Sequence, residues 1–329
     1  MFLFKEVFKE TIWGGDRILR MKDQQPTSHS IGESWEISGI PGHETLVSEG
    51  PEKGKSLKEL ADKYGADLLG RHVMERFGTE FPLLVKFIDA HDDLSIQVHP
   101  DDELARARGH AFGKTEMWYV MDVLPNSRLL VGFNRHLTLD EYDQAVNDGS
   151  IARLMRTYDV KSGDVFFLPP GRVHAIGSGV LLAEIQQSSD ITYRIFDYGR
   201  TDKEGHTREL HTELAKPAID FDCADNDRTR YSTLPDGTAQ LAKCNYFKTK
   251  LLTVENTMEI PIAIHDSFSI IICMEGEVDI EQHDGILPNT ATIRKGHSLL
   301  LPANAVSAVI TPHCNSKLLQ TWIPSLKGQ

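Results

Sequence analysis

The chain has few of the features that mark membrane, secreted or nucleic-acid-binding proteins. Its 329 residues include only four cysteines, which lie far apart and form no Cys-x-x-Cys pair. No apolar run approaches the about 20 residues that cross a membrane, and the N-terminus becomes charged at Lys5, too early for a secretion signal. The formal net charge of −13 argues against general nucleic-acid binding. We therefore expect a cytoplasmic protein with reduced thiols.

The chain does contain enough apolar sequence for a large core, since 40% of its residues are hydrophobic. Apolar residues at helical spacing predict a helical segment over 56–77, with Ser56 as its N-cap. Residues 138–158 break the β pattern and predict two short inserted helices. Apolar runs elsewhere predict strands, among them 81–88, 117–121 and 165–168. Mostly β elements of this kind favour a sandwich or a barrel.

A polar stretch divides the chain. Residues 216–240 are rich in Asp, Asn, Arg, Thr and Pro, which are typical of a linker, and short strand patterns resume after them. We therefore predict a first domain over 1–220, a linker over 221–240 and a second domain over 241–329.

Two polar side chains lie two positions apart in an apolar run. Residues 94–100 have the sequence LSIQVHP, so Gln97 and His99 would project from one face of a strand while their apolar neighbours face the other way. An amide oxygen and an imidazole directed into one small volume suggest half of a metal site.

An internal repeat supplies candidates for the other half. Residues 163–174 (GDVFFLPPGRVH) and 296–307 (GHSLLLPANAVS) share a glycine, a five-residue strand pattern and a proline at identical spacing. Upstream, residues 116–121 correspond in the same way to residues 269–274. We therefore expect two similar β units in one chain.

The two copies differ at two polar positions. The first copy has Glu116 and His174 where the second has Ser269 and Ser307. A purely structural pair would recur in both copies, so the difference favours a metal site in the first copy only.

The spacing resembles the two motifs of the cupin superfamily, whose members are small jelly-roll barrels. This resemblance implies a mainly β fold of two cupin barrels with short helical insertions, the second barrel being metal-free. The implied ligands are Gln97, His99, Glu116 and His174, with Gln97 in place of the usual first histidine. Two nitrogen and two oxygen donors suit one zinc ion per chain, and also other borderline divalent ions.

A closer resemblance covers the chain from about residue 5 to residue 325. Five segments are similar to type I mannose-6-phosphate isomerases: WGG at 13–15, GESW at 32–35, SIQVHPDD at 95–102, GKTEMWY at 113–119 and QSSDITYRIFD at 187–197. The short helical insert resembles the short bacterial branch of that family. The family implies an aldose–ketose isomerase that interconverts D-mannose 6-phosphate and D-fructose 6-phosphate through a cis-enediol, with zinc as cofactor.

Three residues are candidates for the chemistry. The family implicates Arg194 in catalysis, and its permanent charge suits either enediolate oxygens or a phosphate. Lys114 lies two residues before Glu116, so it would share the pocket and either anchor the phosphate or shuttle protons. In an extended run Asp190 would share a face with Arg194, which makes it a candidate base or orienting carboxylate. Which residue takes the C2 proton stays open at this point.

Three further residues are candidates for substrate binding. Lys86 is an unexpected charge in an apolar strand, and is either a second phosphate ligand or a side chain that reaches the barrel rim. Trp13 and Glu33 are candidates for the wall of the sugar pocket, and Trp13 fits a core position equally well. We expect a sugar phosphate as the small-molecule partner, and neither nucleic acid nor a membrane.

Two other functions fit parts of the pattern. A sugar-phosphate sensor on the same barrel would have no need for Lys114, Asp190 and Arg194 around an open metal. A metal-dependent cupin oxygenase would normally have a site richer in histidine than Gln97 permits. The oligomeric state is left open by the sequence.

Overall fold

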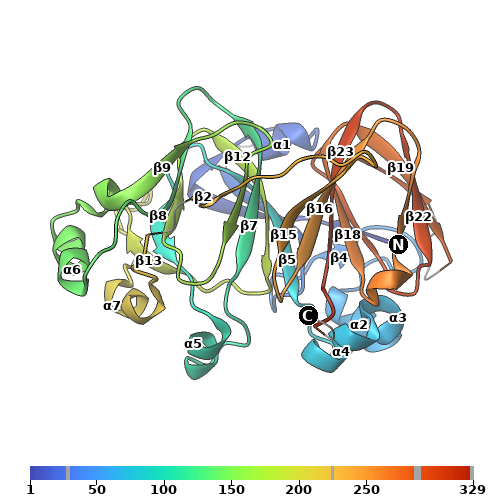
Figure 1. Ribbon diagram of the computed structural model, residues 1–329, viewed down its shortest axis with the longest axis horizontal. Coiled ribbons are helices and arrows are strands. Elements are labelled where there is room, and N and C mark those ends of the chain that lie inside the picture. Colours follow the sequence, from blue (N-terminus) through green and yellow to red (C-terminus); the bar gives the residue numbers. More distant parts are fainter. Residues whose placement is uncertain (27–29, 224–225, 285–289, 327–329) are drawn as a thin grey trace.

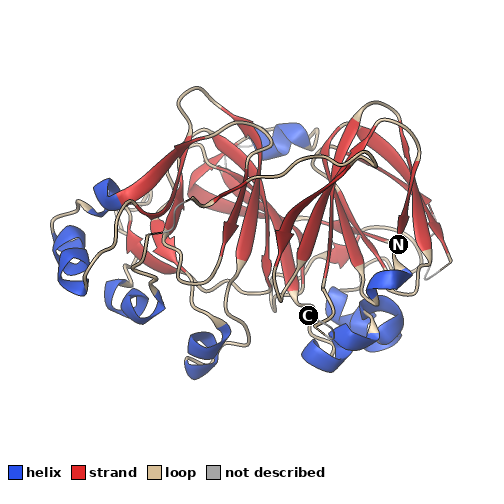
Figure 2. Ribbon diagram, viewed as in Figure 1, coloured by secondary structure: helices blue, strands red, loops and turns tan. Residues whose placement is uncertain are grey.

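The computed structural model describes residues 1–26, 30–223, 226–284 and 290–326. The chain is mainly β, as predicted, and its strands form two barrels that lie side by side with short helices at their ends (Figures 1 and 2). Among the described residues, no helix is long and apolar enough to cross a membrane.

The first barrel consists of a seven-stranded and a five-stranded sheet. The larger sheet has the order β14 (Arg228–Thr229), β10 (Val165–Leu168), β7 (Glu116–Val123), β12 (Val180–Gln187), β5 (Leu83–Asp89), β3 (Ile31–Ser38) and β2 (Val7–Gly15). The smaller sheet has the order β13 (Tyr193–Phe196), β6 (Ile96–Val98), β11 (His174–Ile176), β8 (Arg128–Phe133) and β9 (Met155–Asp159).

The second barrel consists of a seven-stranded and a four-stranded sheet. The larger sheet has the order β15 (Thr238–Lys243), β16 (Lys248–Val254), β23 (Ser316–Trp322), β18 (Ser269–Glu275), β21 (Ser298–Leu301), β1 (Phe2–Lys5) and β4 (Leu46–Val47). The smaller sheet has the order β17 (Met258–Pro261), β22 (Ser307–Pro312), β19 (Glu277–His283) and β20 (Thr290–Arg294).

The predicted repeat is visible in the strand register. Glu116 of β7 pairs with Leu168 of β10, and Ser269 of β18 pairs with Leu301 of β21. Both leucines are the fifth residue after the glycine of their copy. The two copies therefore place Glu116 and Ser269 at equivalent positions in equivalent sheets.

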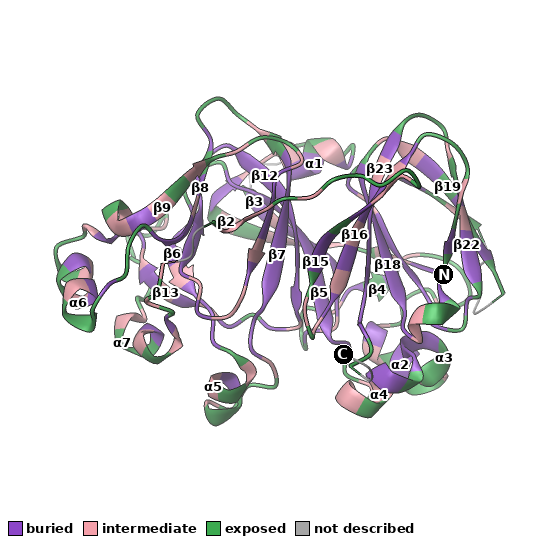
Figure 3. Ribbon diagram, viewed as in Figure 1, coloured by how far each residue is buried: buried purple, intermediate pink, exposed green. Residues whose placement is uncertain are grey.

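A shared core joins the barrels. Successive residues of a strand point to opposite faces, and one face of each seven-stranded sheet packs against the other barrel. Phe87 and Met117 of the first barrel belong to the same buried cluster as Ile270 and Leu319 of the second. The strands at this contact are buried along most of their length (Figure 3). The opposite face of the first barrel's sheet is left to line the barrel interior.

The helices lie at the ends of the barrels. They are α1 (Arg17–Met21), α2 (Leu57–Tyr64), α3 (Ala66–Leu69), α4 (Arg71–Phe77), α5 (Asp102–Ala107), α6 (Leu139–Asn147) and α7 (Thr212–Ala215), with 3₁₀ turns η1 (Ile151–Leu154), η2 (Lys216–Ala218) and η3 (Ala263–His265). The segment expected over 56–77 is helical and Ser56 is its N-cap, as predicted. It is divided into three helices because Gly65 and Gly70 adopt φ of +51° and +93°, which L side chains rarely adopt.

The prediction of two helices within 138–158 is half right. The first is α6, which begins with a capping box at Thr138. The second is a single 3₁₀ turn, η1, and Met155–Asp159 forms strand β9 instead. Residues of β9 pair with β8, and this pairing across the sheet outweighs the local helical spacing.

Two N-terminal strands belong to the sheet of the second barrel. Phe2 of β1 pairs with Leu300 of β21, and Phe4 pairs with Val47 of β4. Within the expected linker, β14 pairs with β10 of the first barrel, and β15 already begins at Thr238. The division into 1–220, 221–240 and 241–329 stays a prediction.

Candidate metal centre

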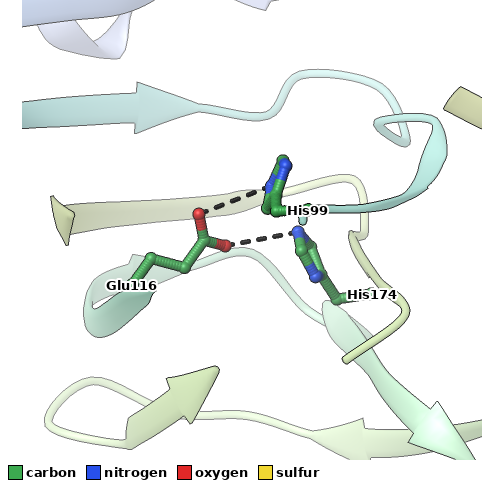
Figure 4. Close-up of side chains that lie close together, drawn as sticks. All are labelled: His99, Glu116 and His174. Carbon is green, nitrogen blue, oxygen red and sulfur yellow. Dashed lines mark ion pairs between the residues drawn. The ribbon is translucent and has the colours of Figure 1, made fainter. Parts of the chain in front are cut away.

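Three buried side chains meet inside the first barrel. His99 follows β6, Glu116 begins β7 and His174 begins β11. Glu116 Oε1 lies 3.2 Å from His174 Nε2, and Glu116 Oε2 lies 3.5 Å from His99 Nε2 (Figure 4). Each residue offers one ligand atom, and these atoms all lie within 4.8 Å of one another. The cluster can therefore hold a metal ion.

The fourth predicted ligand lies beside this triad. Gln97 of β6 is paired with His174 of β11, and its amide Nε2 lies 3.3 Å from His174 Nε2. Its neighbours Ile96 and Val98 are fully buried in an apolar cluster on the other side of the strand. Gln97 of β6 and His99, the residue after β6, both contact His174. The expected alternation is therefore confirmed. A 180° rotation of the amide exchanges its nitrogen and oxygen, so Oε1 can face the same point.

Backbone carbonyls fix which nitrogen of each histidine is available. His99 Nδ1 lies 2.7 Å from Ile191 O, and His174 Nδ1 lies 2.7 Å from Arg172 O. A carbonyl only accepts hydrogen bonds, so each Nδ1 carries the proton and each Nε2 keeps its lone pair. Metal-binding histidines are commonly oriented by such bonds.

Both histidines are held in the neutral form. Burial lowers the pKa of His99 well below its ordinary value, and the Lys114 ammonium lowers it further. Burial likewise lowers the pKa of His174 to about 4, against the opposing hydrogen bond to the Arg172 carbonyl. Neutral imidazole is the form that binds metal ions.

The Glu116 carboxylate fits a cation. It is 1% exposed, and neither of its oxygens accepts a hydrogen bond in the described part of the chain. The Lys114 ammonium lies 3.0 Å from Glu116 Oε2 and 3.0 Å from His99 Nε2. These two candidate ligand atoms therefore already lie next to a positive charge. A buried charge needs such a partner. The residues present therefore fit a divalent ion.

A row of buried charges extends from the triad across the larger sheet. Lys114 Nζ lies 3.7 Å from Glu184 Oε1, Lys86 Nζ lies 3.2 Å from the same oxygen, and Glu33 Oε2 lies 3.6 Å from Lys86 Nζ. The register explains this row, because Glu184 of β12 pairs with Lys86 of β5 on one side and with Trp118 of β7 on the other. Trp118 Nε1 donates to Glu184 Oε2 at 3.1 Å.

The carboxylates keep Lys86 charged. Burial alone would lower its pKa, but Glu184 and Glu33 together raise the pKa above its ordinary value. Lys86 is therefore compensated by two acids inside the barrel. The alternative in which its ammonium reaches the rim is wrong, because its side chain is only 9% exposed.

Arg194 of β13 lies on the face of the five-stranded sheet that also carries Gln97 and His174. It pairs directly with Gln97 of β6, and directly opposed residues share a face. Its Nη1 donates to Glu209 O at 2.9 Å, and Nε has no hydrogen-bond partner in the described structure. Arg208 donates to both carboxylate oxygens of Asp197, which Arg200 also contacts. Burial alone would raise the pKa of Asp197, but these hydrogen bonds lower it.

Asp190 lies apart from the triad. It is exposed, and no described hydrogen bond or ion pair joins it to His99, Glu116 or His174. The expected extended run through Asp190 is shorter than predicted, because β13 begins only at Tyr193. Its charge acts on Lys9 of β2 instead, where it opposes the lowering of the Lys9 pKa by burial. Its role as a base stays a prediction.

The two expected wall residues differ in their surroundings. Trp13 is 4% exposed and packs in an apolar cluster with Trp118 and Leu94, so it is a core residue. Glu33 is partly exposed and accepts a hydrogen bond of 2.7 Å from Trp35 Nε1. Of the two, only Glu33 belongs to the row of charges, as its partly exposed end.

Glu184 is a further buried acid beside the triad that is not among the residues predicted from the sequence. It is 2% exposed and contacts Trp118, Lys86 and Lys114. Its signal in the sequence is a single charged residue in an otherwise uncharged strand, VLLAEIQQ, much as Lys86 is a charge within an apolar run.

A second acidic group lies on the surface. Asp202, Glu204 and His206 approach one another in an exposed hairpin next to the first barrel. Asp202 accepts hydrogen bonds from the backbone of the same turn. This is the behaviour of an ordinary Asx turn, and we assign no ion to it.

Comparison with known proteins places this centre in a family. Residues 1–122 match the model of the phosphomannose isomerase type I catalytic domain. Mannose-6-phosphate isomerase ManA of Bacillus subtilis is 35% identical over 303 residues, which cover 91% of this chain and 92% of the relative. The chain belongs to the type I phosphomannose isomerase family. This family consists of enzymes.

Two further relatives support the same assignment. Mannose-6-phosphate isomerase of Streptococcus mutans is 31% identical over 305 residues and covers 92% of both chains. The crystal structure of mannose 6-phosphate isomerase from Bacillus subtilis superposes with a TM-score of 0.85 at 32% identity, and covers 97% of this chain and 98% of that one. These type I phosphomannose isomerases are similar to the chain along almost its whole length, across both barrels.

Proposed function

We propose that the chain interconverts D-mannose 6-phosphate and D-fructose 6-phosphate by proton transfer between C1 and C2 through a cis-enediol. The observation that carries this proposal is the buried His99–Glu116–His174 triad with Lys114 and Glu184 beside it. The names of the relatives support mannose 6-phosphate as a substrate.

We propose one zinc ion per chain, held by Gln97, His99, Glu116 and His174. The two Nε2 lone pairs, the Glu116 carboxylate and the Gln97 amide oxygen form a nitrogen and oxygen donor set that suits zinc. When bound, such an ion would polarise the sugar oxygens at which negative charge develops.

We assign the proton transfer to Lys114 and Glu184. A group that moves a proton must lie within hydrogen-bond reach of it, and both side chains lie inside the barrel next to the triad. Asp190 is exposed and separate from the triad. Lys86 is compensated by Glu184 and Glu33, so its role is to hold these carboxylates in place.

We assign the phosphate to Arg194. The cluster of Arg194, Arg200 and Arg208 contains the buried acid Asp197, and Glu209 also acts on Arg194, so the three guanidinium groups still leave an excess of positive charge. A dianionic phosphate matches this excess, and guanidinium groups suit phosphate oxygens. Because Arg194 shares a face with Gln97, one end of a sugar phosphate can reach the cluster while the other reaches the triad.

The proposal is tested by a coupled assay of fructose 6-phosphate formed from mannose 6-phosphate. Zinc-loaded protein should turn over, and removal of the ion with a chelator should abolish turnover until zinc is restored. Binding of the sugar phosphate without turnover would identify a sensor and refute the isomerase. Oxygen consumption by the iron-loaded protein would identify the cupin oxygenase.

We further propose a cytoplasmic location and two domains, of which the first contains the centre. The location is supported by the cysteines, none of which is in a disulfide in the described chain; such thiols are typical of reducing compartments. In the domain proposal, the unit 241–329 is completed by β1 and β4.

A further inference from the structure

We infer that Tyr246 of the second barrel is a positioning residue for the metal ligand Glu116, through Asp102. This inference rests on the proposed metal centre. Tyr246 lies in the turn between β15 and β16, and Asp102 is the first residue of α5. In Figure 1, α5 lies below the first barrel, at the end where β15 and β16 are joined. The hydroxyl of Tyr246 donates to Asp102 Oδ2 at 2.9 Å.

The other oxygen of Asp102 holds the segment that leads to Glu116. Asp102 Oδ1 accepts a hydrogen bond of 2.8 Å from Gly113 N and one of 2.9 Å from Gln187 Nε2. Hydrogen bonds to a carboxylate are stronger than bonds between neutral groups. One carboxylate therefore joins α5, the end of β12 and the second barrel.

Gln187 extends the restraint to the residue before Glu116. Its Oε1 accepts from Thr115 N at 2.8 Å, and its own N donates to Thr115 O at 3.1 Å. Between these contacts, Lys114 N donates to Pro100 O at 2.9 Å. Each of the three residues that precede Glu116 is thus bonded to a fixed part of the fold.

The start of the segment has no room to shift. A Cβ placed on Gly113 would lie 2.4 Å from Asp101 C and 2.6 Å from Asp102 N, so the chain passes against the N-terminus of α5 at van der Waals contact. Movement of Asp102 would therefore be transmitted directly to the segment.

Tyr246 is itself held in place. Arg76 of α4 donates from Nη2 to Asn245 O at 2.9 Å, and Cys244 N donates to Phe247 O at 3.0 Å across the turn. The Tyr246 ring packs against the core shared by the two barrels. A fixed hydroxyl can restrain Asp102, which also lies 3.8 Å from the Arg106 guanidinium.

The test is Tyr246→Phe, with Tyr231→Phe as the matched control. Tyr231 also packs against the shared core and donates its hydroxyl to the first barrel, at Gly163 O, but no contact within the described residues joins it to residues 113–116. Zinc affinity is measured by competition with a chromophoric chelator. We expect about a tenfold loss in Tyr246→Phe, the size typical of groups that orient metal ligands, and no change in Tyr231→Phe.

Two further readouts separate positioning from general stability. Amide hydrogen exchange at Thr115 should accelerate in Tyr246→Phe at a temperature where both variants stay folded. In turnover assays kcat should fall while KM for mannose 6-phosphate is retained. Equal zinc affinity and equal exchange in the two variants would overturn the inference. Absence of turnover in the unmodified protein would overturn only the isomerase proposal, because zinc affinity and exchange do not depend on it.

A double-mutant cycle tests the route through Asp102. Asp102→Asn and Tyr246→Phe should each weaken zinc binding, and the double variant should be no weaker than Asp102→Asn alone, because both changes break the same contact. Additive losses would show that Tyr246 does not act through Asp102 and would overturn the inference.

Discussion

At the residue scale, the two histidines of the triad take their ligand role from the backbone behind them. The carbonyls of Ile191 and Arg172 bind the Nδ1 protons, and these carbonyls belong to the segments before β13 and β11. Substitution of the side chains at 172 and 191 would leave the carbonyls in place. The orientation of His99 and His174 therefore depends on strand placement and not on a second side chain.

Replacement of His174 tests the ligand set directly. His174→Ala removes one of the two nitrogen donors and leaves Glu116 without the nearer of its two histidine partners. We expect zinc affinity to fall by more than about 100-fold, beyond the range typical for outer-shell groups. His136→Ala, at an exposed histidine of the same barrel, should bind zinc normally. Full zinc occupancy of His174→Ala at micromolar metal would remove His174 from the set.

The same histidine makes the metal-stripped protein sensitive to acid. The pKa of His174 is about 4 in the folded chain, against 6.5 for the unfolded chain. Between these values the unfolded chain binds more protons, so the free energy of unfolding falls as the pH is lowered. The shift corresponds to about 3 kcal/mol between pH 6.5 and pH 4.

Urea unfolding of metal-stripped protein at several pH values measures this effect. His174→Gln should lose correspondingly less stability over the same interval than the unmodified chain. Identical pH profiles for the two proteins would show that His174 does not titrate with a lowered pKa.

The residues of the centre differ in how far sequence could predict them. Gln97, His99, Glu116 and His174 could be predicted because strand alternation and a fixed repeat spacing decide where they point. For Glu184 the sequence shows only an isolated charge in an apolar run. Its neighbours depend on β12 lying between β5 and β7, a pairing of segments that are distant along the chain.

At the element scale, α3 and α4 attach the first half of the chain to the second barrel. Ala303 N donates to Leu68 O at 2.9 Å, and Asn304 N donates to Asp67 O at 3.0 Å. Gly70, between the two helices, approaches the Asp266 carbonyl so closely that a Cβ would lie 1.8 Å from its oxygen. The local helical spacing predicted these helices, but their docking partner lies about 200 residues away.

Gly70→Ala should be much more destabilising than Gly78→Ala. Both glycines have positive φ, +93° and +60°, and an alanine there costs of order 1–3 kcal/mol. Only Gly70 adds a backbone clash, since a Cβ on Gly78 meets nothing within 4 Å. We expect a further loss of about 1–3 kcal/mol at Gly70, measured by urea unfolding. Equal losses of unfolding free energy in the two variants would mean that the backbone at Asp266 moves away from the added Cβ without an energetic penalty.

At the scale of the whole molecule, the barrels share one core, and two strands from the N-terminal part of the chain belong to the second barrel. The cluster that contains Phe87 and Leu319 spans both seven-stranded sheets, and β1 lies between β21 and β4. The sequence indicated two units and their repeat. It did not indicate that the first strand joins the second unit, because an apolar strand of four residues carries no information about its partner.

We expect the two barrels to unfold together. Separation would expose the shared core and the edge of β21, so neither barrel keeps its native surface alone. Tryptophan fluorescence reports mainly the first barrel, which contains Trp13, Trp35 and Trp118, and far-UV circular dichroism reports both. The two urea midpoints should coincide, and two separate transitions would contradict this prediction.

The place of β1 has a consequence for synthesis on the ribosome. Phe2 is made well before its partner Leu300, which lies about 300 residues further along the chain. At about 5–20 residues per second, the two are separated by roughly 15–60 s of translation. During that interval the first barrel can emerge from the ribosome, while β1 has no β21 to pair with. Strand β1 is thus incorporated into its sheet only after β21 has been made.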